Sequence, residues 1–559
     1  MKTKLSKITS VALSIVLICL MCITASAAQL SGDGTKNNPY VIGNAAQLDA
    51  FSQAVAEGND FSGKFVILDS DIAVSAAFSP IGSEETPFKG VFDGNGKTLS
   101  GFDANKDYAG LFGYTDGAVI SDLTVEGNFR AADYAGAVVA FAKDTVIESC
   151  NASALVYSDT YTGGIAGCLE SGKIVSCTTS NIATVGSFDE YCGGIAGFAG
   201  GVITDCTNNA YTYGIKNVGG IAGYSTSDII SCTNTVTVNA TVTNLGGIAG
   251  LTEGTVKYCK NTGKISTNDV NAGKVGGIAG VAYNAAVTEC MNSGAVAATG
   301  SFAGGIAGYT TNTEITNCIV TAETSANGTY AGGIFGFALE GKTEKCVVTA
   351  TVTAKNNTAG AIGAIAQGTV ADCYYNSAKA DKAVLSGTAT NTNGVSAADL
   401  TDKNALTALD FTKVWAINTL HAAHPVLESI PYHTLDLSVS TKATCTEYGQ
   451  IKGICTLCAE EINKITPAFG HSFMTVSSKE PTCTEEGYKD LLCSTCNASD
   501  TEIIPATGHT DENTDEICDV CNSSTKEKEP EQEKTIFEKI ADFFKSIIDW
   551  LKNLFTVKK

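Results

Sequence analysis

The sequence predicts an all-β fold, a parallel and right-handed β-helix solenoid of about ten coils, from three observations. The five-residue motif GGIAG recurs along the chain, its copies follow one another at a nearly constant spacing, and the intervening segments alternate like strands. A unit of about 28 residues holds three short strands, whereas a propeller blade needs ~40 or more. GGIAG begins at Gly163, Gly193, Gly219, Gly246, Gly276 and Gly304, and GGIFG begins at Gly332.

The second glycine of each motif, aligned with weaker copies, defines a column of equivalent positions. Stacking at about 4.8 Å places each such glycine above the one before it, so ten coils predict a rod roughly 48 Å long. A glycine there lets the chain turn with positive φ or lets neighbouring corners approach closely. The column is Gly110, Gly136, Gly164, Gly194, Gly220, Gly247, Gly277, Gly305, Gly333 and Gly360.

A cysteine follows all but the first of these glycines at a nearly constant spacing, as Cys177 follows Gly164. A metal or redox ladder is one interpretation, and a stack of buried, small apolar side chains is the favoured one. Equivalent Cβ atoms about 4.8 Å apart exceed the usual disulfide range of about 3.5 to 4.5 Å, so we expect reduced thiols. The column is Cys150, Cys177, Cys206, Cys232, Cys259, Cys290, Cys318, Cys346 and Cys373.

Residues 1–28 read as a secretory signal peptide, with Lys2, Lys4 and Lys7 before an apolar run and a small-residue cleavage site. We therefore expect a secreted, extracellular protein associated with the cell envelope. Removing three lysines changes the net charge from −22 to −25. Such a surface repels nucleic acid and polyanions, so no nucleic-acid partner is expected.

Both ends of the solenoid, residues 29–380, need covers, because open strand edges pair with other chains. Residues 44–58 place Leu48, Phe51, Val55 and Ala56 at helical spacing behind a plausible N-cap, Asn44, which predicts an N-terminal capping helix. Residues 381–432 are interpreted as the C-terminal cap.

The segments GTKNNPYVIGNAAQLDAFSQAV, PIGSEETPFKGVFDGNGKTLSGF, AGLFG, the GGIAG series, VWAIN and HPVLE follow one another in this order. In these motifs, residues 29 to about 432 resemble GLUG-repeat proteins exported by Gram-positive anaerobes. The resemblance implies a β-helical surface or secreted protein used for adhesion. GLUG repeats also accompany IgA metalloproteases, but the five histidines include no HExxH pair, so no protease is expected.

Residues 433–524 contain two copies of a Cys/His-rich module, C-x9-C-x2-C-x12-H, and one more CxxC pair after them. Three thiolates and an imidazole complete a tetrahedral Zn²⁺ shell, and a module with so small a core needs such a staple. Structural zinc is favoured, with disulfides as the alternative in an exported chain. The candidate ligands are Cys445, Cys455, Cys458, His471, Cys483, Cys493, Cys496, His509, Cys518 and Cys521.

The tail consists of a charged linker, residues 525–534, and a predicted amphipathic helix, residues 535–559. Its wide apolar face, Trp550 and terminal lysines suit a peripheral position in a membrane interface, or docking onto protein. No stretch of the mature sequence reaches the ~18 apolar residues of a membrane span.

The function favoured by the sequence is a non-enzymatic repeat protein that binds carbohydrate or a host or neighbour-cell surface, with the ligand and binding residues unknown. A β-helical polysaccharide lyase or glycoside hydrolase is the alternative, and a passive spacer is a third. No catalytic residue is assigned, because an enzyme concentrates paired carboxylates at one break in its repeat, whereas these coils stay regular.

Overall fold

The computed structural model describes most of the chain from residue 30 onward. The described residues are 30–75, 78–267, 273–300, 302–419, 421–430, 435–441, 446–447, 449–456, 461–466, 473–493, 498–510, 517–518, 520–521 and 545–549. The predicted signal peptide, residues 1–28, and the linker, residues 525–534, lie outside them.

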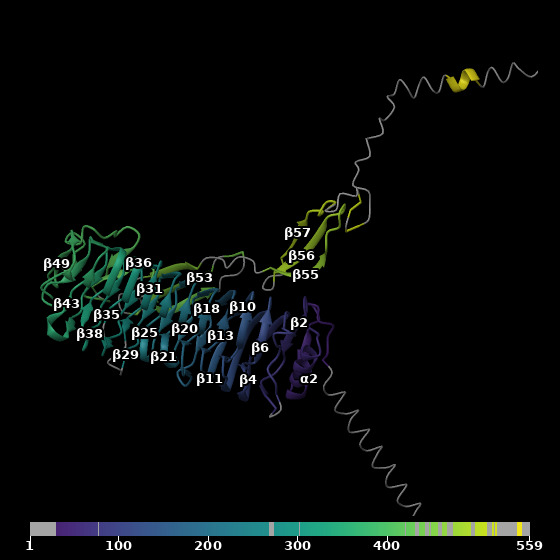
Figure 1. The fold of residues 1–559 in the computed structure, drawn as a ribbon, viewed down its shortest axis with the longest axis horizontal. Helices are drawn as coiled ribbons and strands as arrows, with labels where there is room; N and C mark the ends of the chain where they lie inside the picture. The colour runs from purple at the N-terminus through teal and green to yellow at the C-terminus, as the bar shows by residue number, and fades with distance from the viewer. Residues whose placement is uncertain are drawn as a thin grey trace, which may run out of the picture. The chain divides into compact units, whose positions relative to one another are not determined.

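The all-β prediction is confirmed, since the described residues between 40 and 395 form a parallel β-solenoid of about 12 turns, with 49 strands in one continuous sheet. Figure 1 shows the stacked strands running from α2 and β2 to β43 and β49. The predicted ten coils omit the first rungs, which precede Gly110 and carry no GGIAG motif. The last rung also extends past residue 380, because residues up to Val395 still pair in parallel.

Each turn contains up to five short strand segments, not three. The segment after the glycine pair comprises β6 (Phe112–Asp116), β9 (Val139–Lys143), β13 (Ala166–Leu169), β18 (Ala196–Ala199), β22 (Ala222–Ser225), β26 (Ala249–Thr252), β31 (Ala279–Tyr283), β36 (Ala307–Thr316), β40 (Phe335–Glu344), β44 (Gly363–Ala366) and β47 (Val384–Ser386). The next comprises β1 (Tyr40–Ile42), β2 (Phe65–Leu68), β4 (Val91–Asn105), β7 (Val119–Arg130), β10 (Thr145–Glu148), β14 (Gly172–Val175), β19 (Val202–Thr204), β23 (Ile229–Ile230), β27 (Thr255–Lys257), β32 (Ala286–Thr288), β45 (Thr369–Ala371) and β48 (Ala389–Thr390).

Three further segments complete the turn after the cysteine. The first comprises β3 (Ile72–Ala73), β11 (Asn151–Ser158), β15 (Thr178–Thr179), β20 (Thr207–Asn208), β24 (Thr233–Asn234), β28 (Lys260–Asn261), β33 (Met291–Asn292), β37 (Ile319–Val320), β41 (Val347–Val348), β46 (Tyr374–Asn376) and β49 (Asn393–Val395). The second comprises β16 (Thr184–Ser187), β21 (Tyr211–Gly219), β25 (Val238–Gly246), β29 (Ile265–Thr267), β34 (Val296–Ala298), β38 (Thr324–Ala326) and β42 (Val352–Ala354). The third comprises β5 (Tyr108–Ala109), β8 (Tyr134–Gly136), β12 (Tyr161–Gly163), β17 (Tyr191–Gly193), β30 (Lys274–Gly276), β35 (Phe302–Gly304), β39 (Tyr330–Gly332) and β43 (Ala359–Gly360).

The glycine pair of each motif is required by close packing between coils. Neither Gly219 nor Gly220 has a positive φ. A Cβ built on Gly220 would lie 2.1 Å from the carbonyl oxygen of Gly247 in the next turn. A Cβ on Gly219 would lie 1.9 Å from the carbonyl oxygen of Ala222 in its own turn and 2.7 Å from that of Ile248 in the next. Of the two roles predicted for these glycines, the structure therefore shows close approach of neighbouring corners.

A column of positive φ angles lies elsewhere in the turn, on the residue immediately before each column cysteine. These residues are not glycine, and their φ values lie between 49° and 59°. At this bend the backbone N–H groups change the neighbouring turn to which they donate. The Ser176 N–H donates to the Thr204 carbonyl in the following turn, and the Thr178 N–H donates to the Cys150 carbonyl in the preceding turn. The residues are Ser149, Ser176, Asp205, Ser231, Tyr258, Glu289, Asn317, Lys345 and Asp372.

All nine column cysteines are free and buried at the inner side of this bend. The Cys177 thiol, for example, donates to the carbonyls of Val175 and Ile147 at 3.4 and 3.7 Å. The column is therefore a row of small, buried core side chains, as predicted.

A second buried column is an asparagine ladder, two positions after the cysteines. The Nδ2 atoms of Asn208, Asn234 and Asn261 each donate to the Oδ1 atom of the next asparagine, at 3.0, 2.8 and 2.8 Å. The ladder ends at Asn292, whose buried Nδ2 has no partner, because Val320 occupies the next rung. Side-chain amides suit this position because stacked, in-register strands repeat at the distance over which amides bond.

The N-terminal cap is the helix α2 (Ala45–Ala56), close to the range predicted for it. Asn44 caps it as expected, since its Oδ1 accepts a hydrogen bond from the Gln47 backbone at 3.0 Å. Leu48, Phe51 and Val55 are fully buried, whereas Ala56 is exposed. The Phe51 ring meets three other phenylalanines, which closes the first rungs of the core.

The segment predicted as the C-terminal cap packs on the outer face of the last turns. Residues 396–430 contain the short helix η2 (Asp399–Thr401) and the antiparallel pair β50 (Trp415–Ile417) and β51 (Pro425–Leu427). The buried Trp415 donates from Nε1 to Asn317 Oδ1 at 3.2 Å. It belongs to an apolar cluster formed with the outward residues after the cysteines, which are Met291, Ile319, Val347 and Tyr374 in these turns.

The remaining described residues form two small sheets and part of the tail. One sheet contains β52 (Leu435–Thr441), β53 (Gly449–Cys455) and β54 (Glu461–Thr466), and the other contains β55 (Phe473–Lys479), β56 (Gly487–Cys493) and β57 (Ser499–Ile504). By its contacts the chain divides into two units, residues 1–476 with 492–498 and residues 477–491 with 499–559. Of the predicted helix over residues 535–559, residues 545–549 are described and are helical, and Ile548 is 50% exposed.

We predict that Asn234→Ala destabilises the solenoid by about 2–4 kcal/mol, because it removes the two buried ladder bonds that join Asn234 to the side-chain amides of Asn208 and Asn261. Thermal unfolding of the full mature chain measures this. The control is Thr226→Ala, an exposed position in the same turn, for which we expect a change within about 0.5 kcal/mol. Equal unfolding temperatures for both variants would show that the ladder contributes nothing.

Candidate functional site

One candidate site is a cleft on the outside of the solenoid, which we call the Arg130 cleft. It has a volume of about 390 Å³ and is lined by Arg130, Ala131, Tyr157, Asp159, Phe188 and Tyr213. These residues come from four successive turns, at or just beyond the ends of β7 and β11, beyond β16, and within β21. The volume lies in the range of small-molecule sites, and the lining combines aromatic rings with one cation and one anion.

The strand register explains the shape of the cleft. Arg130, Tyr157, Gly186 and Tyr213 occupy the same position in consecutive rungs. Gly186 has no side chain, and the Tyr213 ring fills its space, since a Cβ on Gly186 would lie 2.7 Å from Tyr213 Cζ. Phe188, two positions after Gly186, is 56% exposed. The cleft therefore forms where a glycine interrupts an outward column.

The sequence analysis left the binding residues unknown, although Arg130 is the one arginine of the chain. The available signal was the combination of that arginine with aromatic residues in three following turns, Tyr157, Phe188 and Tyr213. The regular GGIAG pattern concealed it, because none of these residues belongs to the motif.

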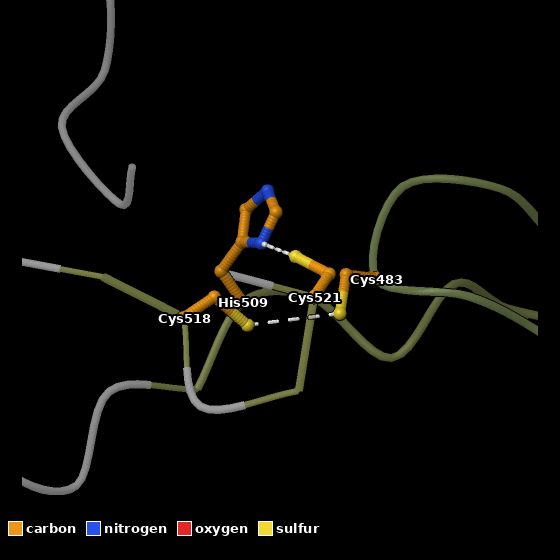
Figure 2. A group of neighbouring side chains, drawn as sticks. All are labelled: Cys483, His509, Cys518 and Cys521. Atoms are coloured by element: carbon orange, nitrogen blue, oxygen red, sulfur yellow. Dashed lines mark hydrogen bonds between the residues drawn. The ribbon is translucent and has the colours of Figure 1, made fainter. Parts of the chain in front are cut away.

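A second candidate site is a group of three thiols and one imidazole, shown in Figure 2. Its members are Cys483, His509, Cys518 and Cys521, and their ligand atoms all lie within 4.8 Å of one another. The Cys483 and Cys518 sulfurs are 3.7 Å apart, and Cys521 Sγ lies 3.3 Å from His509 Nδ1. All four belong to the same compact unit.

These separations match the edges of a tetrahedral metal shell. Zn–S bonds of ~2.3 Å place two sulfurs of a tetrahedron about 3.8 Å apart, with a slightly shorter sulfur to nitrogen edge. Backbone hydrogen bonds from Cys521 and Val520 lower the pKa of Cys518 to about 5, whereas burial raises the pKa of Cys483 to about 11. Hydrogen bonding to Cys518 and Cys521 raises the pKa of His509. The four side chains could hold a metal ion.

The structure groups the predicted ligands differently from the repeated module. The spacing placed Cys483, Cys493, Cys496 and His509 in one set, but Cys483 and His509 lie with the later pair Cys518 and Cys521. Cys493 is buried and is not a member of this group. The sequence spacing could have indicated this grouping, since His509 is closer in sequence to the CxxC pair that follows it than to the CxxC pair that precedes it.

Less of the first module can be described. Cys455 is buried, and its sulfur lies 3.5 Å from Nε2 of His421, a histidine that the module pattern does not include. Cys445, Cys458, His471 and Cys496 lie outside the described residues. No disulfide joins any two of the cysteines that the structure describes.

Comparisons with known proteins show limited similarity. No protein-family model matches the chain. Over 123 residues it is 32% identical to a "Putative Gly-rich membrane protein" of Evansella cellulosilytica, a match that spans 20% of this chain and 14% of that protein. The crystal structure of "a putative immunoglobulin A1 protease from Bacteroides ovatus" matches at 18% identity and a TM-score of 0.31, over 72% of this chain and 95% of that one. No helix among the described residues is long and apolar enough to cross a membrane.

We predict that the full mature chain binds zinc at the group of Cys483, His509, Cys518 and Cys521, and that Cys521→Ser lowers the zinc content by one ion per chain. Elemental analysis after dialysis measures it, with Cys168→Ser, a buried cysteine of the solenoid, as the control. Metal-free protein with a Cys518 to Cys521 disulfide by mass spectrometry would contradict this expectation and favour the disulfide alternative.

Proposed function

We propose that the chain is an exported, non-enzymatic repeat protein of the GLUG type that binds carbohydrate or a host or neighbour-cell surface. The Arg130 cleft is the observation that supports this proposal most. The solenoid presents it on its outer face, with aromatic, cationic and anionic side chains exposed together. Such a lining is typical of ligand-binding sites.

The envelope location and the metal belong to the same proposal. A relative described as a membrane protein is consistent with placement at the cell envelope. Zinc suits the thiol and imidazole group because it accepts three sulfurs and one nitrogen in a closed tetrahedral shell and folds small modules that lack a core. In this role the zinc is structural, and the Cys/His-rich region displays the solenoid.

The test is adhesion by the purified mature chain. Beads coated with it should be retained on a glycan array or on host or bacterial cells, and beads coated with heat-unfolded protein should not. Absence of retention on every surface would favour the passive spacer.

A glycoside hydrolase or lyase is the second candidate, and one observation favours it. Asp93 and Glu148 lie on either side of Ser121 in one outward column, and burial raises the pKa of both carboxyl groups. Two rungs separate them by about 9.6 Å, close to the span of inverting carboxylate pairs.

We predict no turnover, because a carboxyl pair alone does not position a glycosidic bond. Reducing-end and unsaturated-product assays on neutral and acidic polysaccharides check this. The matched variants are Asp93→Asn and Glu148→Gln. Product release that either variant abolishes would identify the chain as an enzyme.

We also propose that residues 535–559 make peripheral contact with membranes. Burying four large apolar side chains at ~1.5 to 3 kcal/mol each exceeds the attraction available from the few lysines, so binding should survive high salt. Liposome flotation of the full chain should therefore be lost in Phe544→Glu and retained in Lys545→Glu. Equal flotation of the two variants would assign the tail to protein contact.

A further inference from the structure

We propose that the Arg130 cleft binds an uncharged saccharide, with aromatic rings against the sugar face and the Arg130 and Asp159 side chains on its hydroxyl groups. The inference rests on the proposed surface-binding function and assigns it a place and a ligand class.

The aromatic rings of the cleft are arranged differently from the other outward aromatics. In the column of Tyr134, Tyr161 and Tyr191 the rings stack on each other, as in the pair Tyr134 and Tyr161, with centroids 4.9 Å apart and planes 4° apart. Stacking covers the facing sides of neighbouring rings in this column.

In the cleft the rings are spaced more widely, since the centroids of Tyr157 and Phe188 are 6.2 Å apart, with their planes inclined at 25°. Two rungs separate Tyr157 from Tyr213, a distance of about 9.6 Å along the backbone. Their ring centroids are nevertheless 6.4 Å apart and inclined at 55°, because the Tyr213 ring leans over Gly186. Phe188 stands beside Tyr157 at 6.2 Å and is 56% exposed. A flat ligand with an apolar face and polar edges fits this arrangement, and a pyranose ring has both.

The polar side chains complement such a ligand. Neither the Arg130 guanidinium nor the Asp159 carboxylate takes part in an ion pair among the described residues. The guanidinium presents a fork of N–H donors and the carboxylate presents two acceptors. Adjacent sugar hydroxyls both donate and accept, so a single residue of a glycan can engage both groups.

Charge favours a neutral ligand over an acidic one. Arg130 is offset by Asp159 within the cleft, and the nearby cation Lys216 is already paired with Asp189 and Glu190 at 2.8 and 3.7 Å. The chain as a whole carries a formal charge of −22. This field repels acidic glycans and acidic peptides before they reach the single arginine.

The experiment is calorimetric titration of the full mature chain with cellotetraose, xylotetraose, mannotetraose and chitotetraose, with trigalacturonate and a hexaglutamate peptide as acidic probes. We expect a neutral tetrasaccharide to bind, and Arg130→Gln and Phe188→Ala each to weaken it by about tenfold or more. Phe188→Tyr should retain binding. Tyr283→Ala, at an exposed aromatic in a distant turn, is the matched control.

The outcomes separate this inference from the function on which it rests. Neutral saccharide binding that Arg130→Gln and Phe188→Ala leave unchanged would overturn the site but support a surface-binding protein. Tighter binding of trigalacturonate or hexaglutamate through Arg130 would overturn the ligand class. Adhesion to cells with no saccharide binding would overturn the inference alone, and absence of both would overturn the proposed function as well. Unchanged melting temperatures in the variants exclude a folding defect.

Discussion

The in-register stacking of one turn on the next, at about 4.8 Å, is the constraint on which the rest of the structure depends. At this spacing, equivalent side chains in adjacent turns contact one another. Each position in the turn therefore becomes a column of similar residues. Glycine is needed where backbones of adjacent corners touch, asparagine can bond its own kind in the interior, and tyrosine stacks on tyrosine outside. The sequence repeat records these columns.

Much of the fold follows from that repeat, and the parts that do not have specific causes. The glycine and cysteine columns and the capping helix were predictable because each has a short sequence signature. The asparagine ladder had one too, in the series CTN, CKN and CMN, but was not recognised. The left-handed bend before each cysteine was not predictable from residue type, since serine, tyrosine and lysine all occupy it, and the backbone hydrogen bonds of both neighbouring turns hold it in place.

The candidate sites were harder to predict than the fold for a physical reason. A ligand shell is a property of distances in space, and a spacing that recurs from one module to the next identifies ligand types without assigning them to one ion. Cys483 joins His509 and the pair at Cys518 and Cys521, while Cys493 does not. The Arg130 cleft depends on Gly186, where a column of large outward side chains is interrupted. A search for repeated motifs does not detect such a single departure from the repeat.

The lateral cover formed by residues 396–430 determines where in the solenoid a turn can be added or removed. Its apolar cluster contacts the outward residues Met291, Ile319, Val347 and Tyr374, whereas the same position in the preceding turns is occupied by Thr207, Thr233 and Lys260. The cover therefore contacts four successive turns and fits only that number. A turn duplicated or deleted before Cys290 leaves these contacts unchanged, but one duplicated or deleted after it moves Trp415 away from Asn317. Recombination between repeats can thus lengthen the solenoid only on its N-terminal side.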